Sequence, residues 1–475
     1  MSTVQRVARN TGVVLSGELI FKLISLVVTI YLARYLGTVG FGKYSFVFAY
    51  LTFFNIITDL GLQQILVREM ARDPKIAPKL IGNAYIIRLL LTIFAVVLSL
   101  IIITLMSYPA DTTSYIYIAA FTLLFISFSD FYRTIFEANL RMEYNTIAKL
   151  TFKVLSAALI LWIIFVLQGT LTQIILVLVF SELVKTLINY SFSRKFVRPR
   201  FSIDFGLWSF LVKAALPLAL SSVIWVIYHQ IDIVMLSVMQ GDAPVGIYSA
   251  AYRLCNPFLI ISTALMMSLF PVMSEAFKTS KEKLIKSYAL GVRYLIIIML
   301  PIAMGITLMS DKIVLLIYGA EFAGSITALQ ILIWAILLGG INLILLNLLV
   351  SIDRQKLNTL SVGICAIVNV VLNLILIPIL SYNGAAIATV VTNVVLFVAS
   401  FYFVSKHLQL PPVRNTLIKL IISGILMGVF VYCFMDITLL LLVPVAVIVY
   451  FAALLALKTF TEEDWDIVKK IVRRT

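Results

Sequence analysis

Charged residues are scarce in this chain of 475 residues: 12% are Asp, Glu, Lys or Arg, against about 25% in a typical soluble protein. Hydrophobic residues make up 62% of the chain, and the mean hydropathy is +1.08. A soluble core cannot absorb so much apolar surface. The composition therefore excludes a soluble enzyme, a nucleic-acid-binding domain and a disordered chain, and it indicates a polytopic membrane protein.

Cysteine and histidine are almost absent, with three and two residues respectively. The cysteines lie singly within apolar runs, and the two histidines are far apart in the chain. Neither a disulfide framework nor a thiolate or histidine metal centre is expected. The sequence also lacks a phosphate-binding loop of the G-x-x-x-x-G-K-[S/T] type, so we expect no metal, no cofactor and no ATP-driven step.

Long connections are missing as well. Apolar stretches of about 20 residues, separated by short polar segments, predict fourteen transmembrane helices. Helices are expected because hydrocarbon forces the backbone polar groups of each stretch to pair within that stretch. We therefore predict an all-α, multi-pass protein of the cell membrane. No extramembrane catalytic domain fits between the spans, so we do not expect an enzyme.

The 37 basic residues exceed the 22 acidic ones, for a formal net charge of +15. When the spans are assigned alternating directions, the basic residues gather on one side, for example at positions 194, 195, 198 and 200 after span six. The positive-inside rule then places both termini in the cytoplasm, which agrees with an even number of spans. Orientation explains most of the charge, so no nucleic-acid partner is expected.

Three short patterns recur in the second half of the sequence. Residues 37–45 (G-T-V-G-F-G-K-Y-S) return at 241–249 as G-D-A-P-V-G-I-Y-S. Arg88 has a counterpart in Arg293, and an R-x-x-x-N-T pattern occurs first at Arg141 and again at Arg354. The same order and sidedness predict two parallel, pseudo-symmetric six-helix lobes. We place them at residues 1–195 and 196–408, followed by two additional helices and a cytoplasmic tail at 409–475.

The start of the chain carries a family pattern at residues 10–12 (N-T-G), 33–37 (A-R-Y-L-G), 41–45 (F-G-K-Y-S) and 59–62 (D-L-G-L). This pattern resembles the polysaccharide-repeat flippase family of the multidrug/oligosaccharidyl-lipid/polysaccharide exporter superfamily. The resemblance implies two lobes around a central cavity lined mainly by spans one, two, seven and eight. It also implies translocation of lipid-diphosphate-linked saccharides. The extra two helices are similar to those that form a groove for the polyprenyl tail in lipid II flippases.

The predicted function is therefore that of a flippase, which moves a polyprenyl-diphosphate-linked oligosaccharide from the cytoplasmic to the outer leaflet by alternating access. Its expected partners are this lipid-linked substrate, membrane lipids and a coupling cation or proton, and a monomer is expected. One alternative is an ion-coupled multidrug exporter of the same superfamily, whose cationic substrates require an acidic cavity. Another is a membrane-embedded glycosyltransferase or polymerase, which needs acidic catalytic residues in sizeable outer loops.

Insertion of a charged side chain at the centre of a transmembrane helix costs about 2.5–3.5 kcal/mol. Because such residues are unfavourable in lipid, those found within spans are candidate functional residues. Four basic side chains are predicted to bind the diphosphate or another anionic headgroup: Lys22, Arg253, Arg88 and Arg293. Each has a structural alternative. Lys22 can be neutralised by Glu18 one turn earlier, and Arg253 can pair with Asp232. The two repeat-related arginines can instead serve lobe packing or extend to the inner surface.

Four further groups are predicted to serve ion coupling or cavity gating: Glu18, Asp59, His229 and Asp232. His229 and Asp232 share a face of span seven, where protonation of either would change the charge of the cavity. A hydrogen bond between these two side chains is the structural alternative. Asp59 is expected to pair with Lys22 or Arg88.

Two patterns concern packing rather than binding. Asp130, Arg133 and Glu137 are spaced to form an internal ladder of ion pairs. The first six predicted spans contain no proline, whereas later spans contain several, among them Pro217 and Pro257. Proline removes a helical hydrogen bond, so helices seven and eight are predicted to bend during opening and closing, or to hold static kinks.

Overall fold

The structure is a computed structural model that describes residues 3–409 and 414–460, with side chains described at residue 17 and over residues 20–409 and 417–460. Every regular element in these residues is helical. Within this described part of the chain, eleven helices are long and apolar enough to cross a membrane, which confirms the prediction of an all-helical, multi-pass protein. Two long helices, α1 (Thr3–Asp59) and α13 (Gln355–Ser405), each contain a non-helical residue where two spans were predicted. The count of fourteen spans and the cytoplasmic termini stay predictions.

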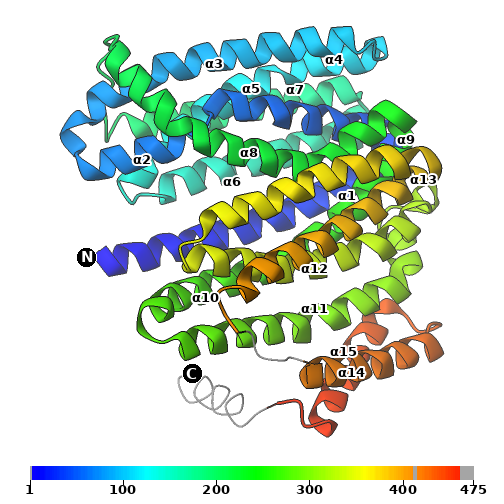
Figure 1. Ribbon diagram of the computed structural model, residues 1–475. Coiled ribbons are helices and arrows are strands. Elements are labelled where there is room, and N and C mark those ends of the chain that lie inside the picture. The colour runs from blue at the N-terminus through cyan, green and yellow to red at the C-terminus, as the bar shows by residue number, and fades with distance from the viewer. Residues whose placement is uncertain (1–2, 410–413, 461–475) are drawn as a thin grey trace. The chain divides into compact units, whose positions relative to one another are not determined.

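The chain packs into two compact units, Met1–Gly246 and Ile247–Thr475. Figure 1 traces their helices along the chain. The first unit contains α1, α2 (Leu62–Arg72), η1 (Pro74–Ile76), α3 (Ala77–Leu105), α4 (Ala110–Ala119), α5 (Phe121–Ala138), α6 (Glu143–Trp162), η2 (Ile163–Leu167), α7 (Leu171–Ser193), α8 (Phe205–Gln240) and the start of α9 (Asp242–Cys255). The second contains the rest of α9, η3 (Asn256–Phe258), α10 (Leu259–Thr279), α11 (Lys281–Ile317), η4 (Ala320–Phe322), α12 (Ser325–Ser351), α13, α14 (Arg414–Cys433) and α15 (Leu439–Ala456).

In the first unit, α1 packs against α3, α6 and α8, while α5 packs against α2 and α7. A core of fully buried apolar side chains joins α2, α3 and α5, with Leu66, Ile81 and Phe131 at its centre. Leu211 of α8 belongs to the same core. The helix of predicted span seven is therefore part of the first compact unit. The compact units are defined by packing, whereas the predicted lobes were defined by the sequence repeat. The lobe boundaries at residues 195 and 408 therefore stay a prediction.

Polar contacts hold the beginning of α8 on the beginning of α3. The Asn83 side-chain oxygen accepts hydrogen bonds from the backbone N–H of Asp204 and from the Trp208 indole, both at 2.9 Å. The Lys79 ammonium lies 2.6 Å from the Asp204 carboxylate and lowers the pKa of that group below its ordinary value. Asp204 also caps α8 by accepting a hydrogen bond from the backbone of Leu207.

In the second unit, α12 is the central helix and packs against α10, α11 and α13. Most of its length is buried, from Ala328 to Leu349. The two additional helices predicted at the end of the chain correspond to α14 and α15, which pack on each other and on α11.

Unusual backbone conformations recur between the two halves of the sequence. Most described residues with positive φ form pairs 204 to 213 positions apart: Gly37 and Gly241, Ser107 and Gly319, Leu140 and Asp353, Gln168 and Ser381. All of them lie where one predicted span turns into the next, a place where left-handed residues commonly end helices. Three positive-φ residues have no such counterpart: Leu60, Gly61 and Lys458. The local geometry of these turns thus follows the repeat seen in the sequence.

The two copies of the repeated glycine motif meet inside the first unit. A Cβ atom on Gly42 would lie 1.8 Å from the Asp242 carbonyl oxygen, and one on Gly246 would lie 2.0 Å from the Thr38 carbonyl oxygen. Thr38 and Asp242 are repeat counterparts, as are Gly42 and Gly246, so the contact is reciprocal in the manner of a two-fold interface. Only glycine at both positions allows the two turns to approach so closely.

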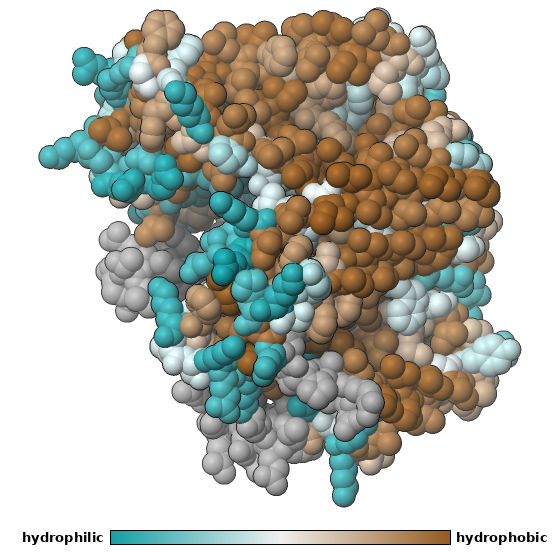
Figure 2. Space-filling view, viewed as in Figure 1, coloured by the Kyte–Doolittle hydropathy of each residue, from teal (hydrophilic) through white to brown (hydrophobic). Residues whose placement is uncertain are grey.

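Large apolar side chains cover broad areas of the surface (Figure 2). Leu105 is 76% exposed, Leu216 is 62% exposed and Leu440 is 87% exposed. In water such extensive apolar patches would drive association, whereas acyl chains are an equally apolar surrounding. The surface therefore agrees with a protein embedded in lipid.

Candidate functional site

The second predicted span of the first unit is broken in its course. Helix α1 ends at Asp59, Leu60 and Gly61 adopt positive φ, and α2 begins at Leu62. The Asp59 carboxylate accepts hydrogen bonds from the backbone N–H groups of Gly61 at 3.1 Å and Gln63 at 3.2 Å. A carboxylate in this place satisfies donors that a helix start leaves open and lies at the positive end of the helix dipole.

Helix α8 passes directly over this break. A Cβ atom on Gly61 would lie 2.7 Å from the Leu218 Cβ and 3.0 Å from the Ala215 carbonyl oxygen. The residue also has φ +82°, which a side chain disfavours. Glycine at this position thus allows both the turn and the close approach of α8.

Arg88 of α3 is the buried counterpart of Asp59. Its side chain is 2% exposed, and its Nη1 lies 2.7 Å from the Asp59 carboxylate. Its Nε donates a hydrogen bond to the Ser127 hydroxyl at 3.0 Å. Because a buried charge needs a partner of opposite sign, Asp59 makes the burial of this guanidinium tolerable. Of the two partners expected for Asp59, Lys22 and Arg88, the structure has Arg88.

The ladder predicted on α5 is also present and is tied to α2. Arg133 lies 3.6 Å from the Asp130 carboxylate and 3.3 Å from the Glu137 carboxylate. Gln63 bridges the two helices: its side-chain oxygen accepts from Arg133 at 2.7 Å, and its amide donates to Glu137 at 2.9 Å. These contacts fix α2 against α5 beside the Asp59–Arg88 pair.

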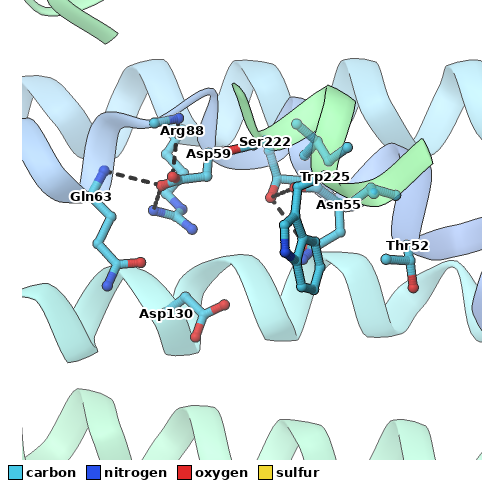
Figure 3. A pocket seen from close by; sticks show the side chains of 12 residues that line it. Thr52, Asn55, Asp59, Gln63, Arg88, Asp130, Ser222 and Trp225 are labelled. Atoms are coloured by element: carbon cyan, nitrogen blue, oxygen red, sulfur yellow. Dashed lines mark hydrogen bonds and ion pairs between the residues drawn. The ribbon is translucent and has the colours of Figure 1, made fainter. Parts of the chain in front are cut away.

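The two groups of charges border a cavity of about 250 Å³ within the first unit. Its polar lining is contributed by Thr52, Asn55, Thr58 and Asp59 of α1, Gln63 of α2, Arg88 of α3, Asp130 of α5 and Ser222 of α8. Figure 3 shows Asp59 and Gln63 on one side of this space, Asp130 rising from α5 and the indole of Trp225 projecting from α8. The cavity thus combines carboxylates, amides, hydroxyls and one large aromatic ring.

Trp225 is one of several cavity residues that the sequence pattern did not single out. The residue is 54% exposed, and His229 stacks on its ring with centroids 4.2 Å apart and planes at 24°. The His229 Nδ1 is 3.0 Å from the Trp225 carbonyl oxygen. A tryptophan in an apolar span is usually read as lipid-facing. Only the path of α8 over Gly61 brings this one to the cavity.

The remaining predicted residues are not among those that line this cavity. Lys22 is half-buried on α1 and forms no ion pair with a described residue, while the side chain of Glu18 lies outside the described residues. Asp232 is buried on α8 at 4% exposure. In the second unit, Arg253 is half-buried on α9, and Arg293 of α11 donates to the Thr459 carbonyl oxygen at 2.6 Å.

The sequence model of the family described as "Polysaccharide biosynthesis protein" matches residues 7–277, more than half of the chain. The chain belongs to the polysaccharide biosynthesis protein family. A second family model, named MatE, matches residues 217–375. The family expected from the motifs near the N-terminus is confirmed.

Two relatives of this family member come from Haloferax volcanii. The "Probable flippase AglR" is 23% identical over 431 residues, which is 86% of each chain. The "Probable low-salt glycan biosynthesis flippase Agl15" is 25% identical over 207 residues, 42% of this chain and 44% of the relative. The match to Agl15 therefore spans less than half of that protein's length.

Among solved structures, the lipid II flippase MurJ in its inward closed conformation superimposes with a TM-score of 0.78. The superposition covers 92% of this chain and 96% of MurJ at 14% sequence identity. At this level of identity the likeness establishes the fold, which is the one that the resemblance implied.

Proposed function

We propose that the protein is a flippase, which translocates a polyprenyl-diphosphate-linked oligosaccharide from the cytoplasmic to the outer leaflet of the cell membrane by alternating access. The observation that carries this proposal is a polar, charged cavity in a membrane-spanning unit of a polysaccharide biosynthesis family member. The relatives named as flippases support a transporter rather than an enzyme.

The chemistry of such a substrate explains why a cavity is needed. Sugar hydroxyl groups lose their hydrogen bonds to water when they enter hydrocarbon, and each unpaired group costs several kcal/mol, about 2–7 by transfer measurements. A cavity lined by carboxylate, amide and hydroxyl groups replaces these bonds. The polyprenyl tail needs no such compensation, because it stays in lipid.

We propose that the diphosphate meets Lys22 and Arg253, with Arg88 and Arg293 as further candidates. Lys22 is supported by the lack of an ion pair with any described residue. Two further amines reach the same stretch of α1, since Lys149 and Lys153 of α6 lie 5.9 Å and 5.0 Å from the ring centroid of Phe21. Ammonium groups are suitable point charges for phosphate oxygens.

Arg88 and Arg293 are already engaged by protein groups, Arg88 with Asp59 and Ser127 and Arg293 with a backbone carbonyl. Arg88 therefore reaches a phosphate only when Asp59 releases it. Such an exchange would connect substrate binding to the break between α1 and α2, which Asp59 caps.

Two sources of driving force are proposed. With the cytoplasm negative, outward movement of an anion is favoured by about 2.3 kcal/mol per charge per 100 mV, so the diphosphate can be driven by voltage alone. Alternatively, a cation or proton is coupled through Glu18, Asp59, His229 or Asp232. A monomer is sufficient for either route.

A cation exporter is the second candidate function. The MatE model matches residues 217–375, and the cavity lining contains the two carboxylates Asp59 and Asp130. A cationic substrate would suit these carboxylates, whereas the amines near Phe21 would oppose its entry. The two candidates therefore differ in the sign of the charge on the substrate.

The deciding experiment uses the purified protein in vesicles. Translocation of a fluorescent polyprenyl-diphosphate disaccharide is measured with an impermeant quencher, with and without an imposed potential, and efflux of tetraphenylphosphonium is measured in parallel. We expect transport of the anionic lipid above empty vesicles and a lower rate for Lys22→Gln, with exposed Lys75→Gln as the control. Transport of the cation alone would refute the flippase and favour the exporter.

A further inference from the structure

The charges around the cavity decide which part of a substrate can occupy it. The lining holds two carboxylates, Asp59 and Asp130, but one cation, Arg88, which is buried and bound to Asp59. The cation nearest to Asp130 is Arg133, which is shared with Glu137 and Gln63. A phosphate in this space would face an incompletely neutralised carboxylate at short range, which is unfavourable. A neutral polar group does not meet this repulsion.

The unused hydrogen-bonding groups of the lining match a sugar hydroxyl. The Asp130 carboxylate is 33% exposed and accepts no hydrogen bond from a described residue. The Asn55 side-chain oxygen accepts from Thr58 at 3.3 Å, and its amide N–H groups have no described acceptor. A hydroxyl both donates and accepts, so it can bond to the carboxylate and the amide at once.

The aromatic ring supplies the third element of recognition. His229 stacks on one face of the Trp225 ring, yet the residue is 54% exposed and is among those that line the cavity. The C–H face of a sugar ring packs well on an indole, because the ring combines a large apolar surface with low conformational freedom. The volume of about 250 Å³ is below the range of about 300–1,000 Å³ for drug-sized ligands, so it suits one ring rather than an oligosaccharide.

We propose that this cavity is a subsite for one neutral sugar ring of the transported glycan, which stacks on Trp225 and hydrogen-bonds to Asp130 and Asn55. The inference deepens the proposed flippase function and rests on it. It separates the recognition of the saccharide, in the first unit beside the break at Gly61, from the recognition of the diphosphate by other basic groups such as Lys22. It therefore removes Arg88, which lines this cavity, from the candidates for the diphosphate.

The first test measures the substrate concentration at half-maximal translocation of the polyprenyl-diphosphate disaccharide. We expect Trp225→Ala to raise it about fivefold to tenfold and Trp225→Phe to raise it less than about twofold, because Phe retains an aromatic face. The matched control is Trp162→Ala on α6, whose side chain is 51% exposed and does not line the cavity. A merely structural role of Trp225 would lower the maximal rate and leave this concentration unchanged, which would overturn the proposal.

The second test does not depend on transport. Saturation-transfer NMR with maltose and with diacetylchitobiose is recorded on the detergent-solubilised protein. We expect contact at the sugar-ring C–H protons in the wild type and in Trp162→Ala, and its loss in Trp225→Ala and Asp130→Ala. Absence of these contacts for both sugars in the wild type would overturn the subsite, as would their displacement by sodium or tetraphenylphosphonium at constant ionic strength. If sugar contacts are present while no lipid-linked glycan moves, the subsite stands and the flippase function fails.

Discussion

The two arginines at repeat-related positions have different surroundings. Arg88 of the first unit forms an ion pair with Asp59 at the edge of a cavity. Arg293 of the second unit instead donates to the backbone carbonyl of Thr459 near the end of the described chain. The positions that correspond to Asp59 in the second half hold Thr263 or Ala264, so that half offers no equivalent carboxylate. The Asp59–Arg88 pair at the edge of the cavity is therefore a feature of the first half that the repeat does not duplicate.

The backbone shows the same contrast. The turns between spans have counterparts in both halves, but the break at Leu60 and Gly61 has none. Helix α10 runs without interruption from Leu259 to Thr279 across the corresponding positions. The turns between spans, which occur in both halves, set the path of the chain. The break at Leu60 and Gly61, which occurs in the first half, borders the cavity. Function in this protein is thus expected where the symmetry is broken.

The largest effect is expected from removing Arg88. Arg88→Met leaves Asp59 with only its helix-capping bonds, and loss of one partner of a buried pair costs about 3–5 kcal/mol; the 27% exposure of Asp59 favours the lower value. Arg293→Met loses, among its other contacts, the charge-assisted hydrogen bond to the Thr459 carbonyl oxygen, worth about 1.5–3 kcal/mol. Denaturant unfolding in detergent measures both losses. If Arg293→Met costs as much as Arg88→Met, the proposed difference between the halves is wrong.

Gly61→Ala tests the unduplicated break directly. The positive φ alone costs about 1–2 kcal/mol, and the new methyl group collides with Leu218, so we expect a total loss of about 2–3 kcal/mol. The corresponding position of the second half already holds Leu265 within a continuous helix. The control is Gly206→Ala, where a Cβ atom meets only the Asp204 carboxylate, at 3.3 Å. Equal unfolding free energies for the two variants would contradict this account.

Gly42→Ala probes the duplicated part, where the two motif copies pack on each other. Overpacking costs about 1–3 kcal/mol, and we expect the upper half of this range because the Cβ atom would meet a backbone carbonyl oxygen, which can move away only with its whole turn. Gly246→Ala should give a similar loss, since the contact is reciprocal. The double variant should lose less than the sum of the single losses, because either substitution alone separates the same turns. Additive losses measured by thermal unfolding would show that the turns do not act as one interface.

The smallest effect concerns the contacts that hold α8 on the first unit. Asp204→Asn removes the ion pair with Lys79 but keeps a good helix cap, so the charge alone is tested. The pKa of Asp204 is lowered in the folded protein, so the stabilisation is present above its ordinary pKa of about 4 and is lost as the pH falls further. We expect a slightly lower melting temperature for the variant at pH 7, and a difference that becomes smaller as the pH falls below about 4. If the difference in melting temperature between wild type and variant did not change with pH, the effect would come from the helix cap of α8 rather than from the ion pair with Lys79.

The sequence alone was sufficient to predict a membrane protein, its helical fold, its internal repeat and its family. Hydropathy and motif spacing are local or periodic along the chain, and hydrocarbon leaves helices as the solution for an apolar stretch of this length. Two polar contacts were also predictable. The ladder at Asp130, Arg133 and Glu137 follows from helical spacing, and the search for a partner of Asp59 was limited by the scarcity of charges to two candidates.

Only the tertiary structure decided how these elements form a cavity. Lys22 and Arg88 were both possible partners of Asp59, and the choice depends on the depth and rotation of α3 against α1. The packing of α8 within the first unit and the position of Trp225 depend on contacts between segments more than 150 residues apart, such as Gly61 with Leu218. One-dimensional patterns do not contain the rotation of one helix about its axis relative to another, so the cavity lining could not be read from them.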